Sequence, residues 1–595
     1  MKHVRIHITG IVQGVGMRPF VYREAVAHGI SGWVLNAGDG VHIEACAAED
    51  ALEVFVRSLR DHAPAASRID HIAVEELDAH DDTVVQASTT SGGASARRKH
   101  SEAHESCGMP AFRIVASRDA TAHTTLVSPD IATCDDCLRE LFDPADRRYH
   151  YPFINCTNCG PRFTIIRDLP YDRAKTSMSA FPMCPDCADE YSDPLDRRFH
   201  AQPDACFACG PHITWRERED HETAMGDKLE ASDAIIARCA EVLAADGIVA
   251  IKGLGGFHLA CRADSEQAVR ELRRRKRRSN KPLAVMVRNM QVAQELCHIS
   301  QVERDLLTGS VRPIVLLMRH AEETCPTKED KVLLAPAVAF DLPELGVMLP
   351  YTPLQHLLME ECRTRGVDAL VMTSGNVSEE PIEMDDGRAW NRLVVNGLAD
   401  ALLGNDRAIL SRFDDSVVRV VNGKVQLVRR ARGFAPRPIA LPVPPASRSS
   451  CILACGPEQK ATLALTRPGS HDAEECFVSQ HIGDLENAET FDAWKAALDR
   501  MSQLFDVRPS VLACDAHAGY LSSQWAQEQA RALGLPLVRV QHHHAHIASV
   551  IAEAAVHGEI DPAARVIGIA FDGTGAGATP NPKVPSANLC SIAPS

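Results

Sequence analysis

The sequence lacks a long hydrophobic run, and this absence excludes several classes of protein. No stretch of about 18 apolar residues occurs, and the N-terminus opens with charged residues instead of an apolar segment. We therefore expect neither a membrane span nor a signal peptide. A positive balance of charge is also missing, because the formal net charge is −16. Nucleic acids and anionic membranes select basic surfaces, so neither is expected as a general partner.

What the chain does contain suits several globular domains. Its 595 residues predict about four domains, and an apolar content of 45% is enough for several hydrophobic cores. The 20 cysteines predict a reducing compartment, so we expect a cytoplasmic protein.

Residues 134–209 carry four Cys-x-x-Cys pairs at regular distances. The gap between the first two pairs is 18 residues, and the gap between the last two is 18 again. Such spacing is typical of zinc held by four thiolates, a closed site that leaves no position for catalysis. Disulfides and redox-active pairs are the alternatives, and a reducing compartment favours zinc. The predicted ligands of two structural zinc ions are Cys134, Cys137, Cys156, Cys159, Cys184, Cys187, Cys206 and Cys209.

The two halves of this segment also resemble each other outside the cysteines. Residues 143–152 are echoed by residues 193–203, at a distance of about 50 residues, which predicts a duplicated zinc module within residues 125–215. The spacing alone does not say which two pairs share an ion; we expect sequential pairs to do so. Two closed sites would make this segment a scaffold between larger domains.

The N-terminal residues combine a strand, a glycine-rich loop and the start of a helix. Apolar and polar residues alternate up to Thr9, which is the period of a half-buried strand. The following loop contains Gly14, Gly16 and Arg18, so backbone N–H groups and a guanidinium are available to hold a phosphate. Asn36 begins a later turn, and its amide is a candidate for orienting an attacking water.

A plain strand-to-helix turn is the alternative for such a loop. Residues 10–20 together with Asn36, however, resemble the acylphosphatase family, which has a ferredoxin-like fold. The resemblance implies that Arg18 and Asn36 are the catalytic residues that bind the acyl phosphate and position water. We expect this domain in residues 1–117, with a flexible insertion at residues 86–110 before its final strand near residues 112–116.

Residues 228–440 contain basic and hydroxyl-bearing residues beside predicted strands. An apolar strand runs into Lys252 and glycines, which favours a phosphate site, although the residue order of a Walker A loop is absent. A basic run at residues 270–281 suits a polyphosphate; a solvated helix face is the alternative. The candidate phosphate-binding residues here are Lys252, Lys276, Arg277, Arg278, Lys281, Ser374, Asn376 and Arg412.

Taken in order, these strings resemble the YrdC-like family, whose members bind ATP and form carbamoyl-adenylates. The resemblance implies that ATP, with Mg²⁺, is a substrate and that these Lys, Arg and Ser groups hold its phosphates. Adenylate formation rests mainly on positioning and charge neutralisation, so no acid or base is required.

Residues 450–595 carry a candidate metal site. His542 and His546 are four residues apart, so on a helix both imidazoles point the same way. With Asp572 at the end of an apolar strand they form a two-histidine, one-carboxylate set suited to iron or zinc; a surface histidine cluster is the alternative. Lys460 is a further candidate for phosphate contact.

These strings resemble the Kae1-like family of actin-fold ATPases, in which the matching histidines and aspartate bind metal beside a nucleotide. The family continues with further glycine motifs and a second lobe, whereas residues 576–595 are rich in Pro, Asn and Ser without a strand or helix pattern. We therefore expect an incomplete domain, truncated or shifted in reading frame. The reaction that such a domain carries out should be weak or absent in this chain.

The order of these regions resembles the HypF family of hydrogenase-maturation carbamoyltransferases. The implied fold class is multidomain α+β and α/β: a ferredoxin-like acylphosphatase domain, two zinc modules of four cysteines each, a YrdC-like α/β domain and a partial actin-like domain. The implied function is hydrolysis of carbamoyl phosphate, formation of carbamoyl-AMP from carbamate and ATP, and transfer of the carbamoyl group to the C-terminal cysteine of a HypE-type partner, where it becomes a cyanide ligand.

Two other functions remain open at this point. A threonylcarbamoyl-adenylate synthase of tRNA modification also pairs YrdC-like and Kae1-like parts, although the acylphosphatase loop argues against it. A zinc-based protein-binding module is the alternative from a different class, because paired Cys-x-x-Cys knuckles often serve binding.

Overall fold

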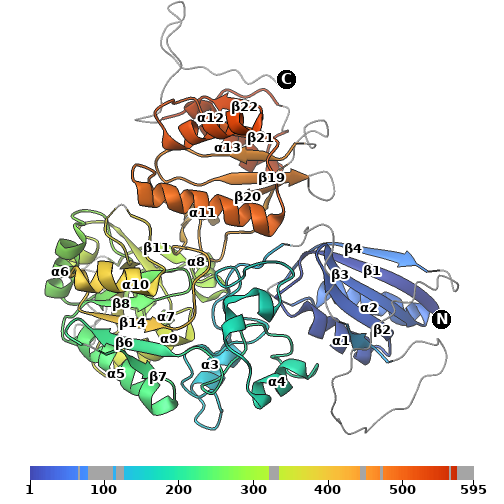
Figure 1. Ribbon diagram of the computed structural model, residues 1–595, viewed down its shortest axis with the longest axis horizontal. Helices are drawn as coiled ribbons and strands as arrows, with labels where there is room; N and C mark the ends of the chain where they lie inside the picture. Colours follow the sequence, from blue (N-terminus) through green and yellow to red (C-terminus); the bar gives the residue numbers. More distant parts are fainter. Residues whose placement is uncertain are drawn as a thin grey trace, which may run out of the picture.

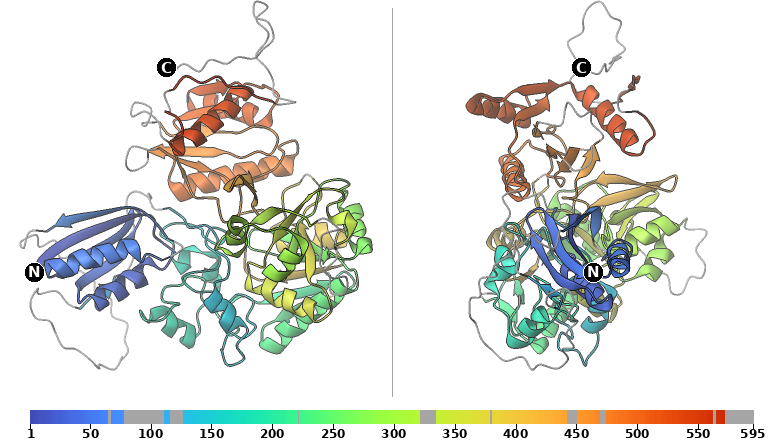
Figure 2. Two further views of the ribbon diagram at one scale, coloured as in Figure 1. Left: turned by 180° about the vertical axis from the view of Figure 1, so that it is seen from behind. Right: turned by 90° about the vertical axis from the view of Figure 1, so that its right-hand side faces the viewer.

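The computed structural model describes residues 1–64, 67–77, 111–115, 126–220, 222–320, 334–378, 380–441, 450–468, 474–561 and 564–571. The cysteine-rich segment lies between an N-terminal domain and a large central domain, and the C-terminal domain sits above the central one (Figure 1). Figure 2 shows the same arrangement from behind. Within the described ranges, no helix has both the length and the apolar character to cross a bilayer.

The N-terminal domain is a sheet covered on one face by two helices that contact each other. Val4, Ile6 and Ile8 of its first strand are buried and the residues between them are half-exposed, as the alternation predicts. The strand order is β4-β1-β3-β2-β5. The elements are β1 (Lys2–Ile11), α1 (Met17–Ala27), β2 (Ser31–Ala37), β3 (Gly40–Ala47), α2 (Glu49–Asp61), β4 (Arg68–Glu76) and β5 (Arg113–Ile114).

The last strand of this domain is shorter than expected. β5 spans two residues and runs parallel to β2, whereas the sequence predicts a strand near residues 112–116. The predicted insertion at residues 86–110 lies outside the described residues.

The cysteine-rich segment contains little regular structure. Helices α3 (Asp135–Leu141) and α4 (Pro185–Ser192) begin directly after Cys134 and Cys184, and two short 3-10 turns, η1 (Arg173–Lys175) and η2 (Ser177–Ala180), lie between them. An arm of this segment, residues 161–171, packs against its neighbours. The ring of Phe163 lies 5.2 Å from that of Phe413 of the central domain, and Tyr171 belongs to the same hydrophobic cluster as the N-terminal core.

The central domain is built on a mixed sheet of order β16-β15-β11-β12-β10-β13-β9-β8-β14-β6-β7. Its helices start with clear caps: Ser300 and Glu303 form a capping box on α8, and Thr352 and Gln355 form one on α9. The strands are β6 (Ile213–Glu217), β7 (Ala224–Gly226), β8 (Val249–Lys252), β9 (Phe257–Arg262), β10 (Val285–Val287), β11 (Ile314–Met318), β12 (Glu344–Met348), β13 (Ala369–Ser374), β14 (Ala401–Asn405), β15 (Val417–Val421) and β16 (Lys424–Arg429).

The helical elements of the central domain are α5 (Leu229–Ala244), α6 (Glu266–Lys276), α7 (Met290–Leu296), α8 (Gln301–Thr308), η3 (Pro336–Val338), α9 (Pro353–Arg363), α10 (Asp386–Ala389) and the π-helix η4 (Trp390–Val395). The sheet begins earlier than residue 228, the domain boundary that the sequence predicts. Because β6 pairs with β14, and β7 with β6, residues 213–226 already belong to this domain.

The C-terminal domain is a sheet of order β17-β20-β19-β18-β21-β22. Trp494, Phe477 and Phe505 are almost fully buried in its core. Its first strand, β17, comes from residues that the sequence assigns to the end of the central domain, and it pairs antiparallel with β20. The elements are β17 (Ile439–Leu441), β18 (Ile452–Ala454), β19 (Ala464–Pro468), β20 (Glu474–Val478), α11 (Ala488–Phe505), β21 (Val511–Asp515), α12 (Leu521–Leu533), β22 (Leu537–Val540) and α13 (His542–Val556).

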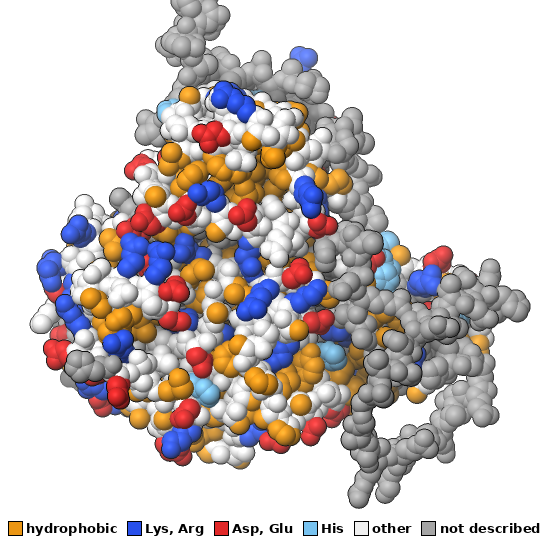
Figure 3. Space-filling view, in the orientation of Figure 1, with side chains coloured by type: hydrophobic (Ala, Val, Ile, Leu, Met, Phe, Trp, Pro, Cys, Tyr) orange, Lys and Arg blue, Asp and Glu red, His pale blue; other side chains and the backbone are white. Residues whose placement is uncertain are grey.

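Charged side chains of both signs are interspersed on the face of the molecule that Figure 3 shows. Hydrophobic side chains gather on this face over the C-terminal domain. The visible described surface therefore offers no broad field of one sign.

Candidate functional site

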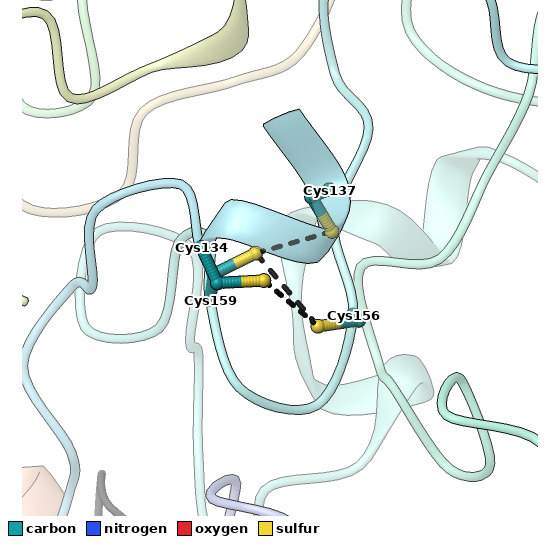
Figure 4. A group of neighbouring side chains, drawn as sticks. All are labelled: Cys134, Cys137, Cys156 and Cys159. Atoms are coloured by element: carbon teal, nitrogen blue, oxygen red, sulfur yellow. Dashed lines mark hydrogen bonds between the residues drawn. The ribbon is translucent and has the colours of Figure 1, made fainter. Parts of the chain in front are cut away.

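The eight predicted zinc ligands form two clusters of four, and sequential pairs share each cluster. In the first, the sulfur distances are 3.7 Å for Cys134–Cys156, 3.9 Å for Cys156–Cys159 and 3.5 Å for Cys159–Cys137. Zn–S bonds of about 2.3 Å in a tetrahedron place sulfurs about 3.8 Å apart, so the cluster fits zinc. Figure 4 shows the four side chains converging on one point.

The second cluster repeats this geometry. Its sulfur distances are 3.7 Å for Cys184–Cys206, 3.8 Å for Cys206–Cys209 and 3.6 Å for Cys209–Cys187. None of the eight cysteines is in a disulfide. In each cluster the first cysteine caps a helix, whose N-terminal N–H groups favour a thiolate.

Arginines of each module reach the zinc ligands of the other. Arg147 Nη2 donates to the sulfur of Cys187 at 3.3 Å, and Arg197 Nη2 donates to the sulfur of Cys137 at 3.3 Å. The neighbouring Arg148 and Arg198, both buried, bind Glu190 and Glu140 of the opposite module. Because four thiolates on a divalent ion leave two negative charges, this exchange places positive charge beside each site.

The glycine loop of the N-terminal domain is pressed against the cysteine-rich segment. Arg162 Nε donates to the carbonyl of Gly14 at 2.6 Å. Gly14 and Gly16 have φ of 70° and 79°, and a Cβ on them would lie 2.9 Å from Tyr171 and 3.2 Å from Thr157. These two positions therefore require glycine for conformation and for space.

Arg18 and Asn36, the predicted catalytic residues, line one cavity with this loop. Arg18 lies in the first turn of α1 and is 6% exposed, and Asn36 on β2 is 3% exposed. The Oδ1 atom of Asn36 is buried without a hydrogen-bond partner in the described structure. Burial lowers the pKa of Arg18, although Asp172, 3.7 Å away, opposes this shift. The site thus combines a buried cation, a helix N-terminus and an unused amide oxygen.

The cysteine-rich segment supplies the other wall of this cavity, with His200 and Gln202 of the second module and Tyr171 of the arm. His200 adopts a left-handed backbone with φ 54°. Burial lowers the pKa of His200 to about 3, and the positive charge of Arg18 contributes to this shift. The imidazole is therefore neutral at physiological pH, a feature that no pattern in the sequence indicated.

In the central domain, the end of α6 meets the end of β13. Lys276 Nζ donates to the backbone carbonyl of Asn376 at 3.0 Å, and Ser374 Oγ donates to Asn376 Oδ1 at 2.8 Å. Arg278 Nη1 is 3.4 Å from Thr373 Oγ1. Burial and the charge of Arg278 lower the pKa of Lys276 to about 7. Two cations and three polar groups therefore share one strand end.

The rest of the basic run has other surroundings. Arg277 ends α6 in a left-handed conformation and is exposed, and Lys281 is exposed as well. The buried Arg273 donates to carbonyls of Ala337 and Lys281, so it holds the loop that follows the helix.

Lys252 ends β8 at the same end of the sheet at which Ser374 ends β13, because β8, β9 and β13 are neighbours and their ends are in register. It is 3% exposed, and its Nζ binds Asp386 Oδ2 at 2.7 Å and the carbonyl of Asn405 at 2.8 Å. Burial lowers the pKa of Lys252.

Arg412 instead lines a cavity of about 250 Å³ between the central and C-terminal domains. Its Nε is buried without a hydrogen-bond partner in the described structure, and burial lowers its pKa. Gln480 of the C-terminal domain donates to its carbonyl at 3.0 Å. Arg388 and Arg500 line the same cavity.

In the C-terminal domain, His542 and His546 face each other at the start of α13. Their Nε2 atoms are 3.2 Å apart, which suits two ligands about 2.1 Å from one ion. The third predicted ligand, Asp572, lies outside the described residues. Lys460 is exposed, and its backbone N–H donates to Asp484 at 2.6 Å.

Several residues with a clear place in these sites were not identified from the sequence. Asp515 binds Nδ1 of His542 at 2.6 Å and so orients a predicted ligand. Asp415 is buried between His258 and Arg432, which lower its pKa well below the ordinary value although burial opposes them. These pairs are 17 or more residues apart in the chain, so no short motif could reveal them.

A further group lies on the open face of the N-terminal sheet. His42 Nε2 is 2.8 Å from Asp39 Oδ1, and the His7 and His42 rings stack with centroids 4.2 Å apart. The hydrogen bond from His42 lowers the pKa of Asp39, so these two residues already serve as partners for each other.

Comparison with known families matches part of each of the four predicted regions. Residues 4–85 match the family described as acylphosphatase, and residues 133–166 and 183–216 match the HypF finger. Residues 241–431 match the Sua5/YciO/YrdC family, described as telomere recombination, and residues 447–553 match the HypF Kae1-like domain. These matches confirm the predicted multidomain fold class and the order of its parts.

Curated relatives match nearly the whole chain. It is 46% identical to carbamoyltransferase HypF2 of Cupriavidus necator over 96% of its own length and 66% of the relative's. It is 43% identical to carbamoyltransferase HypF of Synechocystis sp., covering 97% of the chain and 67% of the relative. The chain thus spans about two thirds of the length of these relatives.

Solved structures agree. A crystal structure of full-length HypF in a phosphate- and nucleotide-bound form matches with a TM-score of 0.81 and 44% identity, covering 97% of this chain and 67% of that one. The crystal structure of HypF from T. kodakarensis matches with a TM-score of 0.80 and 39% identity, covering 97% and 66% of the respective chains.

Proposed function

Because this chain belongs to the HypF carbamoyltransferase family, we propose that it activates the carbamoyl group of carbamoyl phosphate in successive steps. Water and carbamoyl phosphate give carbamate and phosphate in the N-terminal domain. Carbamate and ATP, bound with Mg²⁺, give carbamoyl-AMP and pyrophosphate in the central domain. The carbamoyl group then passes to the C-terminal cysteine thiol of a HypE-type partner, and AMP leaves.

The observation that carries the first step is the convergence of Arg18 and Asn36 on one cavity beside the glycine loop. The guanidinium and the N–H groups of the α1 N-terminus offset the phosphate charge. The unused Oδ1 of Asn36 accepts a hydrogen bond from the attacking water and orients it. Burial strengthens both interactions, because few water molecules compete for them.

Lys276 and Arg278 support the second step. Their positive charges lie where Ser374 and Asn376 end a strand, an arrangement that suits the phosphates of ATP. A carbamate oxygen attacks the α-phosphorus and pyrophosphate leaves, so charge neutralisation and alignment supply the catalysis. Since the pKa of Lys276 is about 7 in the free site, phosphate binding would hold this lysine in its charged form.

The position of the cysteine-rich segment supports transfer between sites. It contacts the N-terminal loop through Arg162 and the central domain through Thr133, whose N–H donates to the carbonyl of Tyr351 at 3.0 Å. Carbamate decomposes readily in water, so successive sites profit from a shared, protected path. The zinc ions stabilise this link and take no part in the reaction.

In the C-terminal domain, His542 and His546 would hold one divalent ion, iron or zinc, with Asp515 orienting His542. Such an ion supplies positive charge beside a bound nucleotide. The cytoplasm is the expected setting, because thiolate zinc sites persist in reducing conditions.

The test is carbamoyl-phosphate-dependent exchange between ATP and pyrophosphate on the full 595-residue chain. We expect exchange with carbamoyl phosphate and none with threonine plus bicarbonate; threonine dependence would favour the threonylcarbamoyl-adenylate alternative. Arg18→Ala should abolish carbamoyl-phosphate hydrolysis while leaving the zinc content at two ions. Hydrolysis that survives this substitution would refute the assignment of the first site, and partner binding without any turnover would favour a zinc-based binding module.

A further inference from the structure

We propose that His200 of the second zinc module contacts the substrate in the N-terminal site and selects acyl phosphates that carry an N–H group next to the carbonyl. This inference rests on the proposed hydrolysis of carbamoyl phosphate and adds a specificity residue from outside the acylphosphatase-like domain.

Most polar groups that the cysteine-rich segment brings to this cavity are already used. Gln202 accepts hydrogen bonds from the Arg173 N–H at 2.6 Å and from the Tyr191 hydroxyl at 2.8 Å, and its Nε2 donates to the His200 carbonyl at 3.1 Å. Thr157 Oγ1 donates to the Arg197 carbonyl at 3.1 Å. These side chains hold the wall in place and have little left for a ligand.

The guanidinium of Arg162 and the hydroxyl of Tyr171 are used in the same way. Arg162 donates to the carbonyls of Gly14, Pro161 and Thr157 at 2.6 to 2.9 Å. The Tyr171 hydroxyl donates to the Pro161 carbonyl at 3.2 Å. Both residues therefore fasten the loop to the arm.

His200 differs from these neighbours. Its Nδ1 atom is buried and has no hydrogen-bond partner in the described structure, as is true of Asn36 Oδ1 across the same cavity. A buried polar atom without a partner is destabilising, so such an atom in a functional cavity points to a missing ligand. The backbone of His200 is held by its N–H, which donates to the Tyr191 carbonyl at 3.0 Å.

The chemistry of the atom defines what it recognises. Beside the buried charge of Arg18 the imidazole is neutral, so it does not compete for the phosphate as a second cation. A neutral imidazole with Nε2 protonated offers a lone pair at Nδ1 and accepts a hydrogen bond. The amino group of carbamoyl phosphate donates such a bond, whereas the methyl group of acetyl phosphate leaves Nδ1 unpaired.

The first zinc module contains a matched control. His150 occupies the equivalent position in the repeat, with φ 56° against 54° for His200. Its Nδ1 lies 2.9 Å from Asp233 of α5, on the side of the central domain. Replacing either histidine therefore imposes a similar backbone cost, but only His200 faces the cavity.

The experiment compares kcat/KM for carbamoyl phosphate and acetyl phosphate in the zinc-loaded full chain. We expect His200→Ala to lower the ratio of the two values about tenfold, which is what one lost hydrogen bond to substrate contributes. His200→Asn keeps an oxygen acceptor near the place of Nδ1 and tolerates the left-handed backbone, so it should restore most of the ratio. His150→Ala should leave the ratio unchanged.

Zinc content and circular dichroism show whether each variant is folded, so a change in specificity can be distinguished from unfolding. Equal losses for both substrates in folded His200→Ala, or no rescue by His200→Asn, would overturn this inference alone. A wild-type chain that hydrolyses neither substrate would overturn the proposed function, and this inference with it.

Discussion

The two zinc modules share one internal design and differ in what they face. Each has four cysteines with nearly equal sulfur distances, a helix capped by the first cysteine and an Asp-Arg-Arg string that crosses to the other module. His150 of the first module meets Asp233 on α5, whereas His200 of the second module faces the cavity of Arg18.

A duplicated scaffold can change at positions on which neither module depends for its stability. The ligands and the crossing arginines must stay the same, because each module stabilises the other. The left-handed histidine lies outside this framework, so one copy serves domain contact and the other faces a candidate active site. Matched substitutions in the two copies can test this division.

Removal of one zinc ligand should have the largest effect. In Cys137→Ser or Cys187→Ser we expect the bound zinc to fall from two ions to one or none, because a structural zinc contributes on the order of 10 kcal/mol to folding. The loss of stability should be larger for Cys137→Ser, since three cysteines of its cluster are buried and only two in the other. Metal analysis and thermal unfolding measure this, and two retained zinc ions would contradict it.

Breaking the crossing arginines should come next. Asp204 is fully buried and lies 2.9 Å from Arg148 but 3.6 Å from Arg198. Arg148→Gln should therefore destabilise the chain by about 3 kcal/mol, more than Arg198→Gln does. Burial raises the pKa of Asp204 to about 6, so the deficit of Arg148→Gln should shrink at pH 5, where this carboxyl is protonated.

Denaturant unfolding at both pH values checks this expectation. Arg139→Gln, at an exposed arginine that pairs with Asp136, is the control and should change stability little. Equal losses of stability in Arg148→Gln and Arg198→Gln would contradict the prediction that Asp204 depends more on Arg148 than on Arg198.

The pH dependence of stability should separate the two histidines by a smaller amount. The pKa of His200 is lowered to about 3 by burial and by Arg18. The unfolded chain takes up a proton near pH 6.5 and the folded chain does not, so this contribution to stability is present above pH 6.5 and is lost as pH falls toward 3.

Between pH 7 and pH 5.5 the loss amounts to about 1 kcal/mol. His200→Asn should remove this part of the slope, and His150→Asn is the matched comparison. Unfolding curves at several pH values measure it; a slope that stays the same in His200→Asn would contradict the assigned environment.

Substitution of the carboxylates beside the two modules should have the smallest effects on KM and stability. Asp172→Asn removes a carboxylate 3.7 Å from Arg18, so we expect the KM for carbamoyl phosphate to fall about twofold. Asp233→Asn removes the partner of His150 and should cost about 0.5 kcal/mol without changing KM. A change of KM in Asp233→Asn would contradict the assignment of His150 and Asp233 to a domain contact alone.

Residue spacing predicted what depends on local geometry. The cysteine gaps indicated two zinc modules and sequential pairing, and the glycines around residues 14–16 indicated a loop against a helix start. In both cases the chemistry needs residues that are close in the chain, so the pattern is visible without the fold.

The basic run shows where such prediction stops. Lys276 and Arg278 face the end of β13, whereas Arg277 and Lys281 are exposed. The direction of each side chain depends on α6 ending at Lys276 and on Arg277 turning into a left-handed conformation. A count of positive charges does not contain that information, and the strand that receives them lies about 100 residues away.

Residues that are distant in the chain and meet only in the fold cannot be predicted from a short sequence pattern. Asp515 and His542 are separated by 27 residues and meet because the end of β21 lies beside the start of α13. Thr352 carries a hydroxyl near a strand end, as Ser374 does, yet it caps α9. Hydroxyl residues serve both roles, and only their neighbours in space decide between them.

Strand β17 has a practical consequence for work with separate pieces of this chain. It lies at residues 439–441, before residue 447 where the Kae1-like match begins, yet it covers the edge of β20 in the C-terminal sheet. A recombinant fragment that starts at residue 447 would leave one edge of β20 unpaired and ready to add a strand from another copy, because only its other edge pairs with β19. A fragment that starts before β17 keeps this edge closed and should resist aggregation.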